Sequence, residues 1–255
     1  MSGAAPIPLL PLRTRAAILL RLLAVQGSWN YELLVGPGIG FCSEPGLRRL
    51  PGGQAGEAYR AALARQARYF NAHPYLASLA VGALVRAETD GEPPAQIERF
   101  RTALCGPLGS VGDRLVWAGW LPFCSLLALS AFGMGASPAV VLILFFGVYN
   151  AGHLTLRVWG INVGWRHGLR VAQALGSPVL RQGPSHIARA AALLAGLALP
   201  LVLRRVVGPD SMPILATAAA VVVIAGLLIR LHGRVEGWRV ALVALAALTL
   251  YSVAR

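Results

Sequence analysis

Apolar and polar residues are distributed differently in the two halves of the chain, and the change falls near residue 120. Before it, apolar runs are short and interrupted. Residues 9–25 carry three arginines in an otherwise apolar run, which suits a helix lying in or entering the membrane interface better than one crossing hydrocarbon. Residues 54–68 place Ala, Leu and Tyr on one side and arginines on another, which predicts an amphipathic helix whose charged face meets cytoplasm or lipid headgroups.

Residues 74–85 form an apolar run that is shorter than the roughly 20 residues needed to span a bilayer. We therefore expect a re-entrant or half-spanning helix. A polar linker is expected over residues 86–101, where Gly91, Pro93 and Pro94 are helix breakers.

Long apolar segments follow residue 120. Residues 123–148 contain no charged residue, and Gly133, Gly135 and Pro138 are expected to divide them into two helical pieces. The pattern leaves open whether this stretch crosses the bilayer once or folds as a hairpin.

Three further apolar segments, each bounded by arginine, are predicted to be membrane helices: residues 190–203, 213–229 and 240–253. The loop expected over residues 157–189 carries five arginines and no acidic residue. By the positive-inside rule, this loop and the one between the last two helices would be cytoplasmic and the C-terminus would be outside.

The chain is therefore expected to be an all-α membrane protein, in which amphipathic, re-entrant and half-spanning helices of the N-terminal half are followed by several transmembrane helices. We divide it into an N-terminal tail at residues 1–11, an interfacial and re-entrant region at 12–122 and a transmembrane region at 123–255. The tail has no basic start before an apolar run and no evident cleavage site, so no cleaved signal peptide is expected.

Composition supports the membrane interpretation. Of the 255 residues, 56% are hydrophobic and only 13% are charged, which argues against an ordinary soluble domain. All 23 basic residues are arginine and the formal net charge is +13. Because these arginines punctuate apolar stretches and do not line one polar helix face, we interpret them as membrane-flanking charges and expect no nucleic-acid binding.

The three cysteines give no sign of a metal centre. Cys42, Cys105 and Cys124 form no CxxC pair and have no histidine at zinc-ligand spacing. They are interpreted as small buried hydrophobic residues, with neither a disulfide framework nor a bound metal.

A first polar cluster, residues 26–32, directly follows an apolar helix. Trp29 offers an apolar face for a pyranose ring, and Gln26, Asn30 and Glu32 can hydrogen-bond hydroxyl groups. Ionisable groups at membrane depth commonly mark a substrate path. An interfacial aromatic belt with a helix cap explains the same residues equally well.

A second cluster, residues 69–75, precedes the short apolar run. Asn71 could cap the next helix and Pro74 fits its first turn. The neutral imidazole of His73 could donate and accept hydrogen bonds to a hydroxylated ligand, although a lone histidine is more often satisfied locally.

The third cluster, residues 105–117, has three glycines around a proline. This composition predicts irregular backbone that is buried or lines a cavity. It is not a phosphate-binding P-loop, because the Lys-Ser/Thr ending is absent. Asp113 could pair with Arg114, cap a helix or contact a ligand.

A fourth cluster ends the longest apolar run. Asn150 and His153 share a helix face, so they could hydrogen-bond across helices or anchor the helix at the interface. An Arg-x-aromatic-Gly element follows at residues 157–160.

Together these clusters resemble the IID component of the mannose/fructose/sorbose family of phosphoenolpyruvate-dependent sugar phosphotransferase systems. The matching patterns are Gln-Gly-Ser-Trp-Asn-aromatic-Glu at residues 26–32, aromatic-Phe-Asn-x-His-Pro at 69–74, Gly-Pro-Leu-Gly-x-Val-Gly-Asp-x-x-x-Trp at 106–117, and an apolar helix ending in Asn before Arg-x-aromatic-Gly at 145–160. Their order and spacing are those of the family, and the likeness covers about residues 12–176.

The resemblance implies a permease half in the bacterial inner membrane without a phosphorylation site or catalytic residue of its own. Such a chain assembles with a IIC chain as a hetero-oligomer and carries a hexose inward, while IIA and IIB proteins relay phosphate to the emerging sugar. No cofactor or metal is expected. The side chains expected to bind sugar or line its path are Gln26, Trp29, Asn30, Glu32, Asn71, His73 and Asp113.

Two departures keep other functions open. The region after residue 177 matches the family more weakly, and Arg114 replaces a small residue or proline. A divergent membrane anchor or regulatory protein that keeps the fold without transport is therefore the alternative. An intramembrane hydrolase using Glu32, His73 and Asp113 would need these side chains within about 3 Å of one another or of a common water, and the sequence has no nucleophile motif for it.

Overall fold

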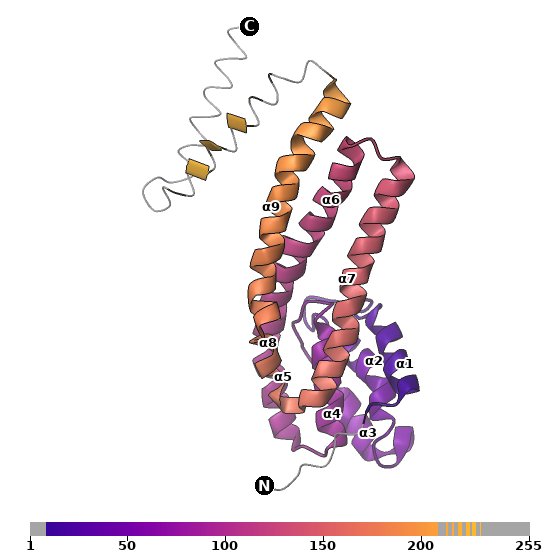
Figure 1. Cartoon of the computed structure of the whole chain (residues 1–255). Helices are drawn as coiled ribbons and strands as arrows, with labels where there is room; N and C mark the ends of the chain where they lie inside the picture. The colour runs from indigo at the N-terminus through magenta and orange to yellow at the C-terminus, as the bar shows by residue number, and fades with distance from the viewer. Residues whose placement is uncertain are drawn as a thin grey trace.

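A computed structural model of the chain describes residues 9–208 and the single residues 213, 216, 219, 220, 223, 224, 226, 227 and 230. Its regular elements are all helices in this part of the chain. Helices α1–α4 cluster around one half of the long helix α7, and α6, α7 and α9 extend away from that cluster (Figure 1). The prediction of an all-α chain is therefore confirmed for the described residues.

The cluster begins with α1 (Leu12–Leu22), α2 (Gly36–Leu47) and α3 (Glu57–Gln66), with a short 3₁₀ turn η1 (Gly53–Ala55) before α3. Helices α1 and α3 lie where apolar runs with arginines predict them. Helix α2 was not predicted, because its sequence is rich in glycine and proline. It packs against α1, α3 and α4, where a side chain on Gly36 or Gly38 would clash with neighbouring backbone.

One carboxylate ties these three helices together. Glu44 of α2 pairs with Arg21 of α1 at 2.7 Å and accepts hydrogen bonds from Arg48, Gln54 and Tyr59. Burial raises the pKa of Glu44, but these hydrogen bonds and the charge of Arg21 outweigh it and lower the pKa to about 2. The carboxylate therefore stays ionised in the folded chain.

Helix α4 (Ala77–Thr89) is the centre of the cluster. Its residues from Ala77 to Val85 are all buried, as expected for a helix that is apolar on every side. The short apolar run of the sequence thus forms a helix, and its re-entrant character stays a prediction.

The polar linker expected at residues 86–101 is mostly helical, so that prediction is wrong. Helix α4 continues to Thr89, and α5 (Pro94–Gly112) begins with Pro94 in its first turn, where the missing N–H of proline does no harm. Only a tight turn separates them, with Gly91 at a φ of 71°. Arg86 pairs with Asp90 one helical turn later, at the C-terminal end of α4.

The irregular backbone expected in the third cluster is also helical. Helix α5 continues into a π-helix, η2 (Asp113–Trp120), and then into α6 (Leu121–Gly133). The single irregularity is this widened π turn, a form that often marks functional sites. The interfacial and transmembrane regions are thus joined by one helical stretch.

The apolar stretch at residues 123–148 folds as a hairpin, which settles the alternative left open above. Helix α6 ends at Gly133, the chain turns at Gly135 with a φ of 103°, and α7 (Pro138–His167) begins with Ser137 as its N-cap. The two helices lie side by side (Figure 1).

Residues 157–189 do not form the expected loop. Arg157 lies inside α7, and the connection consists of η3 (Gly168–Arg170) and α8 (Ala172–Leu175) before α9 (Pro178–Val207) begins. The helix predicted at residues 190–203 is confirmed as part of α9. Residues 240–253, most of 213–229 and the C-terminus lie outside the described residues, and the orientation stays a prediction.

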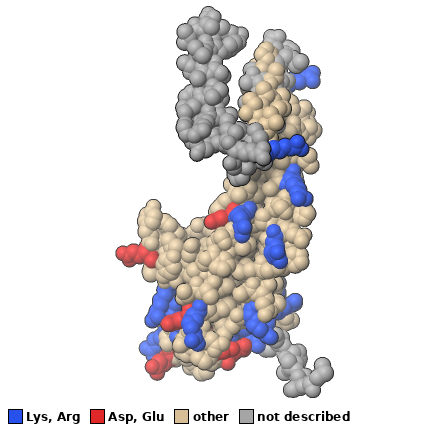
Figure 2. Space-filling model, turned by 90° about the vertical axis from the view of Figure 1, so that its left-hand side faces the viewer, with Lys and Arg blue, Asp and Glu red and all other residues tan. Residues whose placement is uncertain are grey.

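Within the described residues, three helical stretches are long and apolar enough to cross a membrane: Pro94–Gly133, Pro138–Arg170 and Ala172–Val207. Large apolar side chains on them are exposed, including Ile143 at 72% and Leu193 at 78%. Figure 2 shows charged side chains of both signs gathered at the end formed by α1–α5, and basic side chains spaced along one edge of the largely apolar surface beyond it. Apolar surface of this extent marks a face that meets lipid or another protein.

Glycines allow α4 and α7 to approach closely. A side chain on Gly82 of α4 would meet the backbone of Ile161 and Trp165, and one on Gly160 or Gly164 of α7 would clash with α4. Gly160 and Gly164 form a GxxxG pattern, which permits such contacts between membrane helices. This crossing fixes the position of α7 against the cluster.

We expect Gly164→Leu to destabilise the chain, because its side chain would displace the backbone of α4 at Leu79 and Ala83. Overpacking of this kind costs about 1–3 kcal/mol or more. The measurement is the thermal unfolding midpoint in detergent. Gly147→Leu is the matched control on the same helix, since no atom lies within 4 Å of its Cβ position. Equal midpoints for the two variants would contradict the close crossing.

Candidate functional site

The first polar cluster forms an exposed loop between α1 and α2. The side chain of Asn30 accepts hydrogen bonds from the backbone N–H groups of Glu32 and Leu33 at 3.0 and 2.8 Å, which holds the loop in an Asx turn. The N–H of Val35 donates to the carbonyl of Phe70 at 3.1 Å, and the N–H of Phe70 donates to Leu33 at 3.2 Å. The first and second clusters are therefore joined through their backbones.

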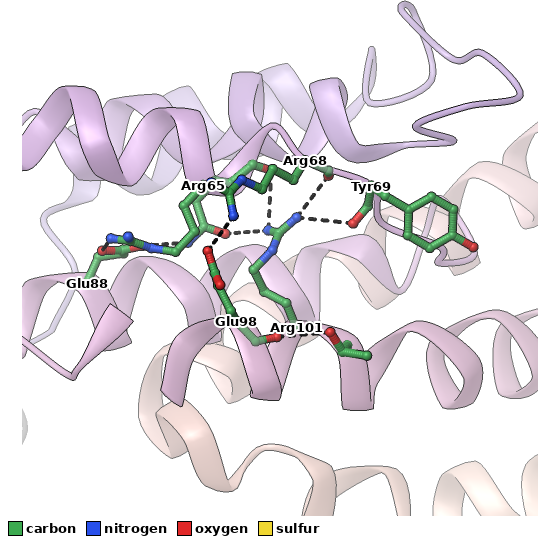
Figure 3. A network of polar contacts seen from close by, with 8 residues as sticks. Arg65, Arg68, Tyr69, Glu88, Glu98 and Arg101 are labelled. Carbon is green, nitrogen blue, oxygen red and sulfur yellow. Dashed lines mark hydrogen bonds and ion pairs between the residues drawn. The ribbon is translucent and has the colours of Figure 1, made fainter. Parts of the chain in front are cut away.

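A buried arginine fixes the start of the second cluster. The guanidinium of Arg101 on α5 donates to the carbonyls of Gln66, Arg68 and Tyr69 at 3.3, 2.9 and 3.4 Å (Figure 3). It also lies 5.1 Å from the ring centre of Phe70. These carbonyls follow the end of α3, where they have no helical partner. Arg101 thus holds the chain as it leaves α3.

Two acidic side chains complete this network. Glu88 of α4 pairs with Arg65 at 2.8 Å and accepts a hydrogen bond from the amide of Gln66 at 2.6 Å. Glu98 of α5 pairs with Arg68 at 2.6 Å (Figure 3). Arg65 therefore lies against another helix, and not on a face that meets cytoplasm or headgroups as the amphipathic pattern predicted.

The second and third clusters meet at His73. Its backbone N–H lies 3.4 Å from the carbonyl of Leu108, and a side chain on Gly112 would clash with its Cβ and ring. The side chain of Asn71 lies 3.7 Å from the position that a Cβ of Gly109 would occupy. The glycines of the third cluster therefore let α5 come close to this segment, which is the close backbone approach that glycine permits.

His73 belongs to a group of aromatic rings centred on Tyr75. The ring of His73 meets the edge of Tyr75 with centres 5.0 Å apart, and it lies 5.0 Å from Trp117 of η2. Tyr75 and Trp117 lie 6.1 Å apart. Because the π turn includes Trp117, it helps to place this indole against the other two rings.

One face of α7 closes the group from the other side. Tyr75 and Tyr149 share a hydrogen bond of 2.6 Å between their hydroxyls, and His153 stacks on Tyr75 at 4.9 Å. The guanidinium of Arg157 lies 5.0 Å from the ring centre of Tyr75 and donates to the carbonyl of Leu22 at the end of α1. Residues 149, 153 and 157 follow one another at helical spacing, so they share this face.

His73 keeps a hydrogen-bond donor without a partner. Only 2% of the residue is exposed, and its Nδ1 accepts the backbone N–H of Tyr75 at 3.2 Å. Burial, followed by the positive charge of Arg157, lowers the pKa of His73 to about 4. The ring is therefore neutral at pH 7 and carries its proton on Nε2, which has no partner among the described residues.

His153 offers the complementary group. The amide nitrogen of Asn150 donates to the carbonyl of Phe146 at 2.6 Å, so its oxygen accepts from Nε2 of His153 at 2.8 Å. The Nδ1 atom of His153 is then an acceptor, and it is buried without a partner in the described part of the chain. The Nε–H donor of Arg157 is likewise buried without a partner among the described residues. Unsatisfied buried groups of this kind call for a functional explanation.

Most side chains expected to line the sugar path lie at the surface. His73 is buried. Those that are exposed on this chain are Gln26, Trp29, Asn30, Glu32, Asn71 and Asp113. No hydrogen bond or ion pair joins Glu32, His73 and Asp113 among the described residues, so the hydrolase alternative gains no support.

Three local roles expected from the sequence are different in the structure. Asn71 does not cap α4, whose N-cap position is Leu76. Asp113 lies inside a continuous helix, where it caps no helix and forms no ion pair with a described residue. Asn150 and His153 bond to each other within α7 and not across helices.

Sequence reasoning did not select Tyr75, Trp117, Tyr149 or Arg157 as site residues. The spacing of residues 149, 153 and 157 is a signal that could have found the face of α7. No group of three or more His, Cys, Asp or Glu side chains suitable for a metal ion occurs in the described structure.

Comparison with known proteins agrees with these shared motifs. Residues 10–207 match the model of the family described as the PTS system mannose/fructose/sorbose family IID component. The mannose-specific EIID component of Escherichia coli K12 is 29% identical over 173 residues, covering 65% of this chain and 59% of that protein. The sorbose-specific EIID component of Klebsiella pneumoniae is 30% identical over 175 residues, covering 65% and 61%.

The fructose permease IID component of Bacillus subtilis is 29% identical over 156 residues, covering 58% of this chain and 54% of that protein. The matched region thus spans less than two thirds of each of these relatives.

Two solved structures share the fold. A cryo-EM structure of the mannose transporter ManYZ in complex with microcin E492 contains a chain that is 22% identical, with a TM-score of 0.57 and coverage of 96% of this chain and 97% of that one. A structure described as a membrane protein gives a TM-score of 0.67 at 20% identity, with coverage of 96% and 98%. The family match and the three long apolar helical stretches in the described part of the chain identify it as a membrane protein.

We expect His73 to stay neutral and protonated on Nε2 from pH 8 down to about pH 5. ¹⁵N NMR of the histidine-labelled chain would measure both the tautomer and the titration. Between the ordinary pKa of 6.5 and the folded value of about 4, protons bind the unfolded chain preferentially, so this residue's contribution to stability falls as pH falls through that window. The exposed His167 provides a second histidine signal for reference. A titration of His73 near pH 6.5 would contradict the described environment.

Proposed function

Since the chain belongs to the family of IID components of mannose/fructose/sorbose phosphotransferase systems, we propose that it is the IID subunit of a mannose-type permease. It pairs with a IIC chain in the bacterial inner membrane, crosses that membrane several times and helps to carry a hexose inward. The relatives are named for mannose, sorbose and fructose, which supports a hexose as the substrate.

The single observation that best supports a sugar path is the pair of unsatisfied histidine nitrogens beside Tyr75. His73 offers a buried N–H donor and His153 a buried nitrogen acceptor. A sugar hydroxyl both donates and accepts, so neutral groups of both kinds suit it. Aromatic rings around them offer apolar faces to a pyranose ring. His73, Tyr75 and His153 are therefore proposed to contact sugar as it passes.

The exposed members of the path are proposed to face the IIC chain. Trp29 and Tyr31 are 44% and 88% exposed and contact each other edge to face. Aromatic side chains are enriched where proteins meet. Gln26, Asn30 and Glu32 share that loop, so a IIC chain covering it would bring them into the same polar chamber.

Asp113 and Asn71 are proposed to extend the sugar path from His73, Tyr75 and His153 toward the chamber shared with the IIC chain. Asp113 lies one turn before Trp117 in η2, and Asn71 lies two residues before His73. Both are exposed on the isolated chain. Their carboxylate and amide oxygens accept hydroxyl donors.

Phosphate transfer is proposed to occur outside this chain. IIA and IIB proteins relay phosphate from phosphoenolpyruvate, and IIB phosphorylates the hexose as it emerges from the IIC and IID pair. The contribution of this chain is binding and alternating access, without a catalytic residue, metal or cofactor of its own.

A membrane anchor or regulator that keeps the IID fold without transport is the second proposal. It is motivated by the limited match, which spans 59% of the mannose-specific relative. The two proposals differ in whether substitutions at His73, Tyr75 or His153 change hexose uptake.

We expect His73→Ala to lower hexose uptake about tenfold or more when the complete system is expressed, because a buried donor to the sugar is lost. Glu32→Gln should lower uptake as well, by removing a charged acceptor. Uptake of radiolabelled hexose, normalised to the amount of chain in the membrane fraction, is the measurement. His167→Ala, at an exposed histidine outside the group, should leave uptake unchanged. Normal uptake in both test variants would overturn the proposed path and leave the regulator as the better proposal.

We also expect the chain to co-purify in detergent with a IIC chain encoded in the same genome. Replacing Trp29 and Tyr31 by alanine should weaken this association, because large exposed aromatic surface would be lost from the contact. The exposed pair Arg60 and Arg99, each replaced by glutamine, provides a control on other helices. Size-exclusion chromatography of the tagged chain measures the complex. A chain that always elutes alone would contradict the pairing.

A further inference from the structure

An apolar groove of about 500 Å³ runs between α7 and α9, with η2 along its floor. Three of its lining residues are small, namely Ala151, Gly152 and Gly183, and Gly152 lets the ring of Trp120 lie against α7. Apolar and small side chains line it: Leu115, Trp120, Val148, Ala151, Gly152, Thr155, Leu156, Leu180, Gly183 and Ile187. His73, Tyr75 and His153 do not line this groove.

A basic pocket of about 400 Å³ adjoins the groove at Leu180, which lines both. Its polar side chains are Arg114 of η2 and Arg181 and Ser185 of α9. Both arginines are exposed, and neither forms an ion pair within the described part of the chain. Arg114 donates to the carbonyl of Ser110 at 3.2 Å, which leaves the rest of its guanidinium free. Asp113 lines neither pocket.

The pocket lies beside the first turns of α9. Arg181 stands in the first turns of α9, and Arg204 stands in its last turn. The helix rises about 34 Å from Arg181 to Arg204, close to the roughly 30 Å thickness of the hydrocarbon core. The apolar groove begins at Leu180, next to Arg181, and follows α9 as far as Ile187.

We propose that this composite site binds an anionic phospholipid. One acyl chain lies in the groove between α7 and α9, and the phosphate is held by Arg114 and Arg181. Guanidinium groups bind phosphate oxygens with paired hydrogen bonds. A partner helix would fill the apolar groove, but the phosphate of a lipid also accounts for two adjoining arginines that have no acidic partner.

Binding can be measured with the purified full-length chain in detergent, to which phosphatidylglycerol or phosphatidylcholine is added. We expect phosphatidylglycerol to raise the thermal unfolding midpoint in a saturable way, and phosphatidylcholine to do so much less. Arg114→Gln with Arg181→Gln should weaken the phosphatidylglycerol effect about 10- to 30-fold in apparent affinity, because each arginine near a membrane surface contributes a factor of about five. Arg60→Gln with Arg99→Gln is the charge-matched control and should bind as the original chain does.

A second variant tests the acyl chain independently of charge. Ala151→Phe narrows the groove without touching either arginine, so it should weaken binding of phosphatidylglycerol but leave any effect of inorganic phosphate unchanged. An equal response to both lipids, an unchanged affinity in the double arginine variant, or stabilisation by inorganic phosphate as strong as by the lipid would overturn the proposal. Loss of lipid binding when a IIC chain is co-purified would assign the groove to a partner helix and overturn it as well.

Discussion

The contact between α4 and α7 determines how the rest of the chain is arranged. Gly82, Gly160 and Gly164 bring the two backbones close enough that added side chains would collide. Between membrane helices, such packing supplies attraction that hydrophobic burial does not. The crossing also sets the position of α7 along the cluster. It thereby places Tyr149, His153 and Arg157 around Tyr75, which precedes α4. The polar group is thus assembled by an apolar contact.

Polar groups are held there at a cost in free energy that surrounding contacts offset. A buried donor without a partner is unfavourable by about 1–3 kcal/mol, and His73 keeps one because it cannot move away. The absence of a side chain on Gly112 lets α5 pack directly against the ring of His73. The backbone N–H of Tyr75 donates to Nδ1 of His73. Arg101 holds the preceding segment through its hydrogen bonds to backbone carbonyls. A neutral donor with a fixed direction is better suited to recognising a hydroxyl than to carrying charge.

The arginines serve several physical roles that a count of charges does not separate. Arg101 and Arg157 are buried and bind backbone carbonyls that follow α3 and end α1, and Arg205 does the same for carbonyls at the end of α6. These contacts satisfy acceptors that helices leave free at their C-termini. Arg114 and Arg181 differ, since they flank an apolar groove and have no acidic partner in the described structure. Two guanidinium groups beside an apolar groove suit the phosphate of a lipid.

The sequence by itself determined the features that depend on neighbouring residues: the helical, apolar character, the break between Gly133 and Pro138 and the motifs that identify the family. Only the tertiary structure decided which polar groups are buried. Glu32 and His73 look alike in a linear pattern, yet one is exposed and the other enclosed. It also made a helix of the Gly- and Pro-rich segment Gly36–Leu47, whose propensity predicts none. The physical reason is that burial and helix packing come from segments far apart in the chain, whose contacts no local pattern contains.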